Sequence, residues 1–326
     1  MTSVVLSVRG LTVSFGGGVE AVREVDLDVH RAEFVALLGE SGSGKSVTAR
    51  AIMGLGDDDV TVAAERLELA GIDLLRVDPE QRRRLRGERM SLVLQDALSA
   101  LNPVLTIGDQ IGELFRVHRG EGRRAARRHA IELLGLVGIP APERRVDDYP
   151  HQFSGGMRQR ILIAMAVALE PELIIADEPT TALDVTVQAQ ILELLDRLRT
   201  QLGTAILLIT HDLGVVMEVA DRVAVMYAGR VVESGPAEEV LDRPAHPYTE
   251  ALLSAVPRVE LRGGELVAIP GSPPHPGRLP TGCAFHPRCA WAVDRCRTEP
   301  PALQEIADGR RAACFRVEEV LRAGVR

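Results

Sequence analysis

The chain contains 326 residues, of which 46% are apolar, and its net charge is −8. This composition excludes a disordered chain, and the acidic balance argues against a protein that binds nucleic acid through a global positive field. No apolar run approaches the roughly 20 residues that span a bilayer, and the N-terminus lacks the charged start and long apolar run of a signal peptide. We therefore expect a cytosolic protein with a sizeable core, whose association with any membrane comes through partners.

The first 30 residues are predicted to form strands, because Val25–Val29 alternates apolar and polar residues. Short apolar runs that end in polar residues then recur at Phe34–Leu38, Leu92–Leu94, Leu173–Ala176 and Ala205–Ile209. Helical stretches such as Val187–Leu202 separate these runs, which predicts an α/β fold with a mainly parallel sheet buried on both faces. Ligands bind beyond the carboxyl ends of such strands, so we expect the polar strand endings to form one site.

Two other stretches depart from this pattern. The segment between Gln95 and Ser154 is mostly helical in character and is interrupted by prolines, which predicts a helical subdomain at about residues 96–165. Prolines accumulate after about residue 256, and all four cysteines lie between residues 283 and 314. We therefore assign residues 1–255 to one domain with an antiparallel β-subdomain at its start, and residues 256–326 to a small loop-rich C-terminal module.

The sequence from Gly39 to Ser46 fits the phosphate-loop pattern G-x-x-x-x-G-K-[ST] and lies between an apolar strand and a helical pattern. Backbone N–H groups of such a loop surround phosphates, and the helix that follows adds its positive end. Lys45, the only lysine of the chain, is expected to reach the β- and γ-phosphates, and Ser46 to bind Mg²⁺. The residues predicted to bind a nucleotide here are Gly39, Ser41, Gly42, Gly44, Lys45, Ser46 and Val47.

Two adjacent acids, Asp177 and Glu178, end another apolar strand. Adjacent acids are common at solvated strand ends, but together with a phosphate loop they predict the second half of a nucleotide site. We expect Asp177 to hold the Mg²⁺ shell and Glu178 to act as the general base toward the attacking water. Gln95 and His211 also follow apolar strands, and we expect Gln95 to bind Mg²⁺ or the attacking water and His211 to contact the γ-phosphate.

The sequence Phe153-Ser-Gly-Gly-Met-Arg-Gln-Arg160 resembles the signature of ATP-binding-cassette (ABC) ATPases, although Met157 stands where that family has glutamine. In this family two cassettes close head to tail around two ATP molecules. The resemblance therefore implies that Ser154, Gly155 and Gly156 contact the ATP held by a partner cassette. It also identifies Ala182-Leu183-Asp184 as the D-loop, with Asp184 on the partner side.

The same resemblance assigns roles to residues outside the signature. Gln95 resembles the Q-loop glutamine, His211 the switch histidine, and Phe15 the aromatic residue that stacks on adenine. The segment from Asp96 to about Gln110 resembles the groove that receives a permease helix in this family. The implied activity is hydrolysis of ATP in the presence of Mg²⁺.

Further motifs resemble the dipeptide, oligopeptide and nickel importer branch, whose D-type subunit the chain is similar to. They are Leu101-Asn-Pro103, His246-Pro-Tyr-Thr249, Leu252-Leu253, Val256-Pro257, Ile269-Pro-Gly271 and Gly282-Cys-Ala-Phe-His-Pro-Arg-Cys289. The branch implies two transmembrane permeases, an extracytoplasmic substrate-binding protein, a second cassette that is a paralogue, and a place at the cytoplasmic face of the cell membrane. It implies import of peptides, with nickel or a metal chelate as the alternative cargo and a soluble ABC ATPase of DNA repair or translation as the remote alternative.

The four cysteines, Cys283, Cys289, Cys296 and Cys314, lie in one proline-rich module. A cytosolic setting argues against structural disulfides, and a small module with a poor core favours a metal that ties it together. The spacing has no C-x₂-C pair and leaves zinc and an iron–sulfur cluster open. The resemblance to peptide-importer subunits favours a four-iron–four-sulfur cluster.

Overall fold

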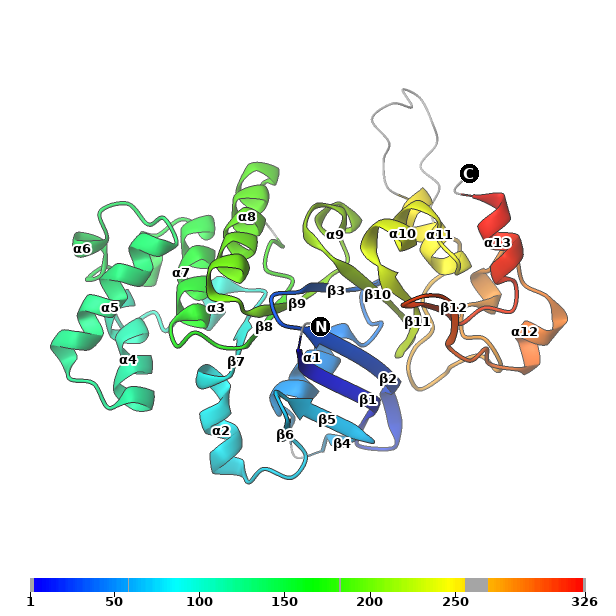
Figure 1. The fold of residues 1–326 in the computed structure, drawn as a ribbon, viewed down its shortest axis with the longest axis horizontal. Coiled ribbons are helices and arrows are strands. Elements are labelled where there is room, and N and C mark those ends of the chain that lie inside the picture. Colours follow the sequence, from blue (N-terminus) through cyan, green and yellow to red (C-terminus); the bar gives the residue numbers. More distant parts are fainter. Residues whose placement is uncertain (1–2, 58, 182, 256–268, 325–326) are drawn as a thin grey trace. The chain divides into compact units, whose positions relative to one another are not determined.

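The computed structural model describes residues 3–57, 59–181, 183–255 and 269–324 (Figure 1). The chain forms two compact units, each assembled from separate stretches of sequence. Unit 1 comprises Met1–Leu6, Val29–Phe34 and Glu68–Leu208. Unit 2 comprises Ser7–Asp28, Val35–Leu67 and Ile209–Arg326.

Unit 1 contains most of the long helices. Its elements are β6 (Ile72–Asp73), α2 (Pro79–Glu88), β7 (Met90–Val93), α3 (Ala97–Ala100), α4 (Ile107–Arg119), α5 (Arg123–Leu136), α6 (Pro142–Arg145), the 3₁₀ turn η1 (Pro150–Gln152), α7 (Gly155–Val167), β8 (Leu173–Asp177), α8 (Val185–Leu202) and most of β9 (Ala205–Thr210). Strands β7 and β8 pair in parallel, and β9 is the other neighbour of β8. Every residue of β8 and β9 is buried, which confirms the prediction of solidly apolar strands.

Helices α2 and α7 pack against strand β7. Helix α7 packs against β7, α5 and α8, and α4 packs against α5. Both ends of α4 are set by residues that favour helix boundaries. Thr106 caps the start by accepting a hydrogen bond from the backbone N–H of Asp109, and Gly120 ends the helix in a left-handed conformation.

Unit 2 contains the first strands, the phosphate loop and the C-terminal region. Its elements are most of β1 (Val4–Phe15) and β2 (Val19–His30), β3 (Phe34–Leu38), α1 (Lys45–Met53), β4 (Thr61–Ala63), the start of β5 (Arg66–Leu69), α9 (Leu213–Val219), β10 (Arg222–Tyr227), β11 (Arg230–Pro236), α10 (Ala237–Asp242), α11 (Pro247–Ser254), the 3₁₀ turn η2 (His286–Arg288), α12 (Asp294–Thr298), β12 (Gln304–Ala307), β13 (Arg310–Ala312) and α13 (Val317–Ala323).

The strands of unit 2 pair in both directions. Strand β3 pairs in parallel with β10, and β1 pairs antiparallel with β4. Strands β11, β13 and β12 then continue from β10 in antiparallel order. The sheet is therefore mixed rather than mainly parallel on this side, because short C-terminal strands complete it.

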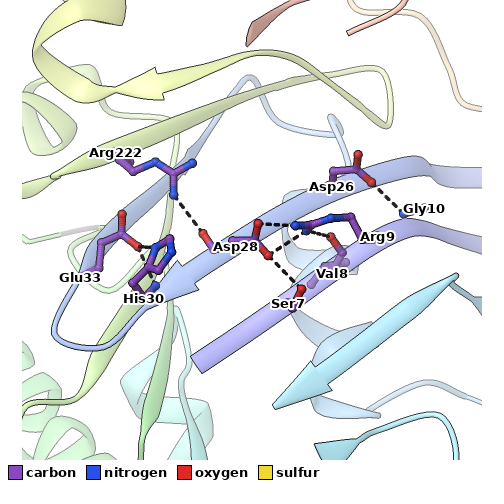
Figure 2. Close-up of polar contacts among 9 residues, drawn as sticks. All are labelled: Ser7, Val8, Arg9, Gly10, Asp26, Asp28, His30, Glu33 and Arg222. Carbon is purple, nitrogen blue, oxygen red and sulfur yellow. Dashed lines mark hydrogen bonds and ion pairs between the residues drawn. The ribbon is translucent and has the colours of Figure 1, made fainter. Parts of the chain in front are cut away.

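Polar contacts between strands hold β1, β2 and β10 of unit 2 together (Figure 2). The guanidinium of Arg9 donates two hydrogen bonds to the Asp28 carboxylate, at 2.8 and 2.5 Å. Ser7 Oγ donates to the same carboxylate at 3.0 Å, and Arg222 Nη1 donates to the Asp28 backbone carbonyl at 3.4 Å. Bidentate pairing of an arginine with a carboxylate is directional, so these contacts fix the register of β1 against β2.

Candidate functional site

The phosphate loop of unit 2 runs from the end of β3 to the start of α1, and its glycines are sterically required. Gly44 caps α1 with φ 108°, and a Cβ at this position would lie 2.7 Å from the carbonyl oxygen of Ala21. A Cβ at Gly39 would lie 2.2 Å from the carbonyl oxygen of Met226. The loop backbone therefore packs so closely on β2 and β10 that no side chain fits at either position.

The side chains of this loop are arranged for an anionic ligand. Lys45 is 5% exposed, and its Nζ donates hydrogen bonds to the carbonyl oxygens of Gly39 at 2.7 Å and Glu40 at 2.9 Å. Ser43 Oγ is buried without a hydrogen-bond partner among the described residues. A buried lysine, an unpartnered hydroxyl and the start of a helix suit the phosphates of a nucleotide.

The two other nucleotide residues predicted for this unit lie at strand ends. Phe15 is the last residue of β1 and remains partly exposed. His211 follows β9 directly and is exposed, and Asp212 after it caps α9 through the backbone N–H of Gly214.

In unit 1, the carboxylate of Glu178 is held by two donors. Gln95 Nε2 donates to Glu178 Oε2 at 3.0 Å, and Thr181 Oγ1 donates to the same oxygen at 2.9 Å. Glu178 has φ 47°, an uncommon value for a residue with a side chain, and Asp177 before it is buried at the end of β8. Gln95 and Glu178 thus lie together as expected, whereas Thr181 was missed, although a hydroxyl three residues after the glutamate was the available signal.

The predicted signature also lies in unit 1, at the start of α7. Ser154 is the N-cap, and its Oγ accepts a hydrogen bond from the backbone N–H of Met157 at 3.3 Å. Asp184 caps α8 in the same way, by accepting from the backbone N–H of Val187 at 3.0 Å. A Cβ at Gly156 would lie 2.6 Å from Val187 Cγ1, so the signature helix packs directly against the start of α8.

This signature cap uses the backbone of Met157, so the cap does not require the glutamine that the family carries at that position. Ala182 of the predicted D-loop and Val256-Pro257 of the importer motifs lie outside the described residues.

The four cysteines lie together in unit 2. They line one small cavity with Phe285, Trp291 and Phe315 among its walls. All four are free thiols, and the backbone N–H of Cys283 donates to the carbonyl of Cys296 at 2.8 Å. Burial raises the pKa of Cys289 to about 12 and that of Cys314 to about 11, so these thiols are neutral in this environment.

The predicted metal-binding character of this module is not seen in the geometry. Among the described residues, no group of three or more histidine, cysteine, aspartate or glutamate side chains is arranged to hold a metal ion. The four cysteines nevertheless line the same cavity.

The described parts of the chain also contain no helix that is both long enough and apolar enough to cross a membrane.

Comparison with known proteins places this chain in a family. Residues 22–181 match the model of the ABC transporter family, and residues 232–296 match that of the oligopeptide/dipeptide transporter C-terminal region. The chain is 50% identical over 312 residues to the dipeptide transport ATP-binding protein DppD of Escherichia coli (strain K12), and the matched stretch covers 95% of both chains. It is 49% identical over 315 residues to DppD of Bacillus subtilis (strain 168), which covers 95% of this chain and 94% of the relative.

A solved structure shows the same fold. The ATP-binding cassette MJ0796, in a dimeric post-hydrolysis state bound to ADP and phosphate, matches 71% of this chain and 98% of its own with a TM-score of 0.63 and 28% identity. ATP hydrolysis coupled to transport is therefore the activity of this protein. The chain belongs to the ABC transporter family and carries the C-terminal region of its oligopeptide/dipeptide transporters.

Proposed function

We propose that this chain powers the import of dipeptides or oligopeptides across the cytoplasmic membrane. The observation that carries the proposal is the 50% identity to a dipeptide transport ATP-binding protein over 95% of both chains, C-terminal region included. ATPase subunits of ABC importers work with transmembrane permeases, and often with a partner ATPase. We assign to this chain two permeases, a paralogous second cassette, an extracytoplasmic substrate-binding protein and a position at the cytoplasmic face of the membrane.

The residues of the phosphate loop are proposed to bind ATP. Its N–H groups and Lys45 would hold the β- and γ-phosphates, and Phe15 would stack on the adenine. The hydroxyl of Ser46, the carboxylate of Asp177 and the amide of Gln95 are oxygen donors of the kind that Mg²⁺ prefers. When bound, Mg²⁺ would neutralise charge that develops on the phosphates.

Glu178 is proposed to be the general base. Its carboxylate orientation is set by the donors Gln95 and Thr181, and a carboxylate fixed in this way can accept a proton from a water aligned with the γ-phosphate. His211 is proposed to contact the γ-phosphate. Ser154, Gly155, Gly156 and Asp184 are proposed to complete the ATP site of the partner cassette, a role supported by the helix start that Ser154 caps.

A groove of about 280 Å³ in unit 1 is the proposed contact for a permease helix. It is lined by Gln95, Asp96, Ala97, Leu98, Gly155, Arg158, Gln159, Thr181 and Leu183. Leu98 is 55% exposed on its rim, and an exposed leucine of this kind suits an apolar partner. Because Gln95 and Thr181 both line the groove and hold Glu178, a helix seated there would sense the state of the catalytic carboxylate.

The four cysteines are proposed to hold a four-iron–four-sulfur cluster within a C-terminal module of residues 256–326. Support comes from the cavity that all four cysteines line and from the donor set, since four thiols become four thiolate ligands once a metal displaces their protons. The cluster would tie distant segments of the module together. Zinc is the alternative, and analysis of iron, zinc and acid-labile sulfide in anaerobically purified protein separates the two. Protein with neither metal would overturn the proposal.

The transport proposal is tested with Glu178→Gln at the native locus. Uptake of labelled dipeptides and oligopeptides should be lost, because turnover stalls after ATP binds, whereas uptake of chelated nickel should be unchanged. The matched control is Glu193→Gln, the same chemical change at an exposed position of α8. Loss of nickel uptake alone would move the assignment to a metal importer. Unchanged uptake of every cargo would refute the importer.

A further inference from the structure

The C-terminal region of unit 2 contacts the phosphate loop directly. Arg288, the last residue of η2, donates from Nη1 to Glu40 Oε2 at 2.7 Å and from Nη2 to Glu40 Oε1 at 3.0 Å. Glu40 is the second residue of the loop, 248 positions earlier in the chain. The Arg288 side chain is 5% exposed and that of Glu40 is 25% exposed, so this bidentate pair is largely shielded from water.

A second contact holds the backbone of the same residue. The N–H of Glu40 donates to the hydroxyl of Tyr248 at 2.8 Å, and Tyr248 is completely buried on α11. Arg288 is itself fixed, because its Nε donates to the carbonyl of Pro270 at 2.8 Å and its Nη1 to the hydroxyl of Tyr227 at 3.3 Å. Both the side chain and the backbone of Glu40 are thus anchored to residues that follow the nucleotide-binding segments.

Anchoring of Glu40 extends to the phosphate-binding lysine. The carbonyl oxygen of Glu40 accepts a hydrogen bond from Lys45 Nζ at 2.9 Å, and that of Gly39 accepts one at 2.7 Å. The N–H of Glu40 and the carbonyl of Gly39 belong to one peptide group. The hydrogen bond from this N–H to Tyr248 therefore sets the orientation of the Gly39 carbonyl that Lys45 contacts. Rotation of Glu40 would displace the carbonyl that orients the lysine amine.

We propose that Arg288 and Tyr248 are positioning residues for ATP binding. They hold Glu40, and through it the phosphate loop and Lys45, in the conformation that receives the phosphates. The C-terminal region, which sequence comparison associates with peptide transporters, therefore acts on the first step of the ATPase cycle. The inference rests on the ATPase activity and is independent of the cargo and of any metal at the cysteines.

The test compares steady-state ATP hydrolysis by assembled transporters that carry Arg288→Lys, Tyr248→Phe or Glu40→Gln. Lysine keeps the charge of Arg288 but cannot form the bidentate pair, and phenylalanine removes only the hydroxyl that accepts from Glu40. The matched control is Arg295→Lys, because Arg295 forms an exposed pair with Glu299 in the same region. Each variant is also analysed for its unfolding midpoint and its metal content.

We expect the KM for ATP to rise about tenfold in Arg288→Lys and Glu40→Gln, with a smaller rise in Tyr248→Phe and little change in kcat, because the contacts act before chemistry. The double variant Arg288→Lys with Glu40→Gln should resemble either single variant, since both remove one interaction. Arg295→Lys should match the parent.

A KM for ATP that stays within about twofold of the parent in Arg288→Lys and Tyr248→Phe would overturn the proposal and leave the contacts a purely structural role. If Arg288→Lys fails to assemble, Tyr248→Phe decides, because it removes a single oxygen and keeps the buried ring. The cargo is assigned from uptake by the Glu178→Gln strain against its Glu193→Gln control. That comparison does not use the KM values measured here, so a wrong cargo assignment is recognised separately.

Discussion

Lowering the pH from 7 to 5 should destabilise this protein through the buried His246. The imidazole is 2% exposed, its Nδ1 accepts the backbone N–H of Tyr248 at 3.0 Å as the N-cap of α11, and the ring also bonds to the backbone of Ala313. Burial lowers the pKa of His246 to about 3, from 6.5 for an exposed histidine. The folded chain therefore keeps this ring neutral.

The magnitude follows from the protons bound in each state. Between pH 6.5 and pH 3 the unfolded chain binds a proton at His246 that the folded chain does not, so stability is complete above this window and falls as the pH falls through it. At pH 5 the solution is about 1.5 units below the unfolded pKa, and at 1.36 kcal/mol per unit this amounts to about 2 kcal/mol. Burial raises the pKa of the Glu233 carboxyl, which accepts the backbone N–H of His246 at 3.0 Å, so its own titration requires a control.

The assay is urea denaturation at pH 7 and pH 5 of the parent and of His246→Asn. Asparagine retains an acceptor for the N-cap but does not titrate, so the loss at pH 5 should be about 2 kcal/mol smaller in the variant. The contribution of Glu233 is common to both proteins and cancels in the comparison. An equal loss of stability in both proteins would refute the reasoning.

Three further changes have defined outcomes. Gly156→Ala should destabilise the chain by about 1–3 kcal/mol, because its Cβ would lie 2.6 Å from Val187 Cγ1, and Val187→Ala should restore part of the loss in urea denaturation. Thr181→Val removes one donor to Glu178 and should lower kcat about fivefold without changing the KM for ATP; an unchanged kcat would show that Thr181 is not needed to orient the carboxylate. Cys289→Ser should reduce the bound iron or zinc and lower the unfolding midpoint, whereas retention of the full metal content would exclude Cys289 as a ligand.

Local sequence predicted the elements of the site. The glycines of the phosphate loop, the buried strands β3 and β8, and the helix start at Ser154 depend on steric freedom, apolar runs and a side chain that caps the next turn. These interactions join residues a few positions apart, so the pattern of residue types is enough to identify them.

Contacts between distant segments required the tertiary structure. The direct hydrogen bond from Gln95 to Glu178, the antiparallel continuation from β11 through β13 to β12, and the bond between Arg288 and Glu40 have no periodic signal in the sequence. Arg288 lies in a motif that points to the cysteines, yet its side chain binds the phosphate loop. Only folding brings these residues together, because hydrogen bonds and ion pairs depend on separation in space rather than along the chain.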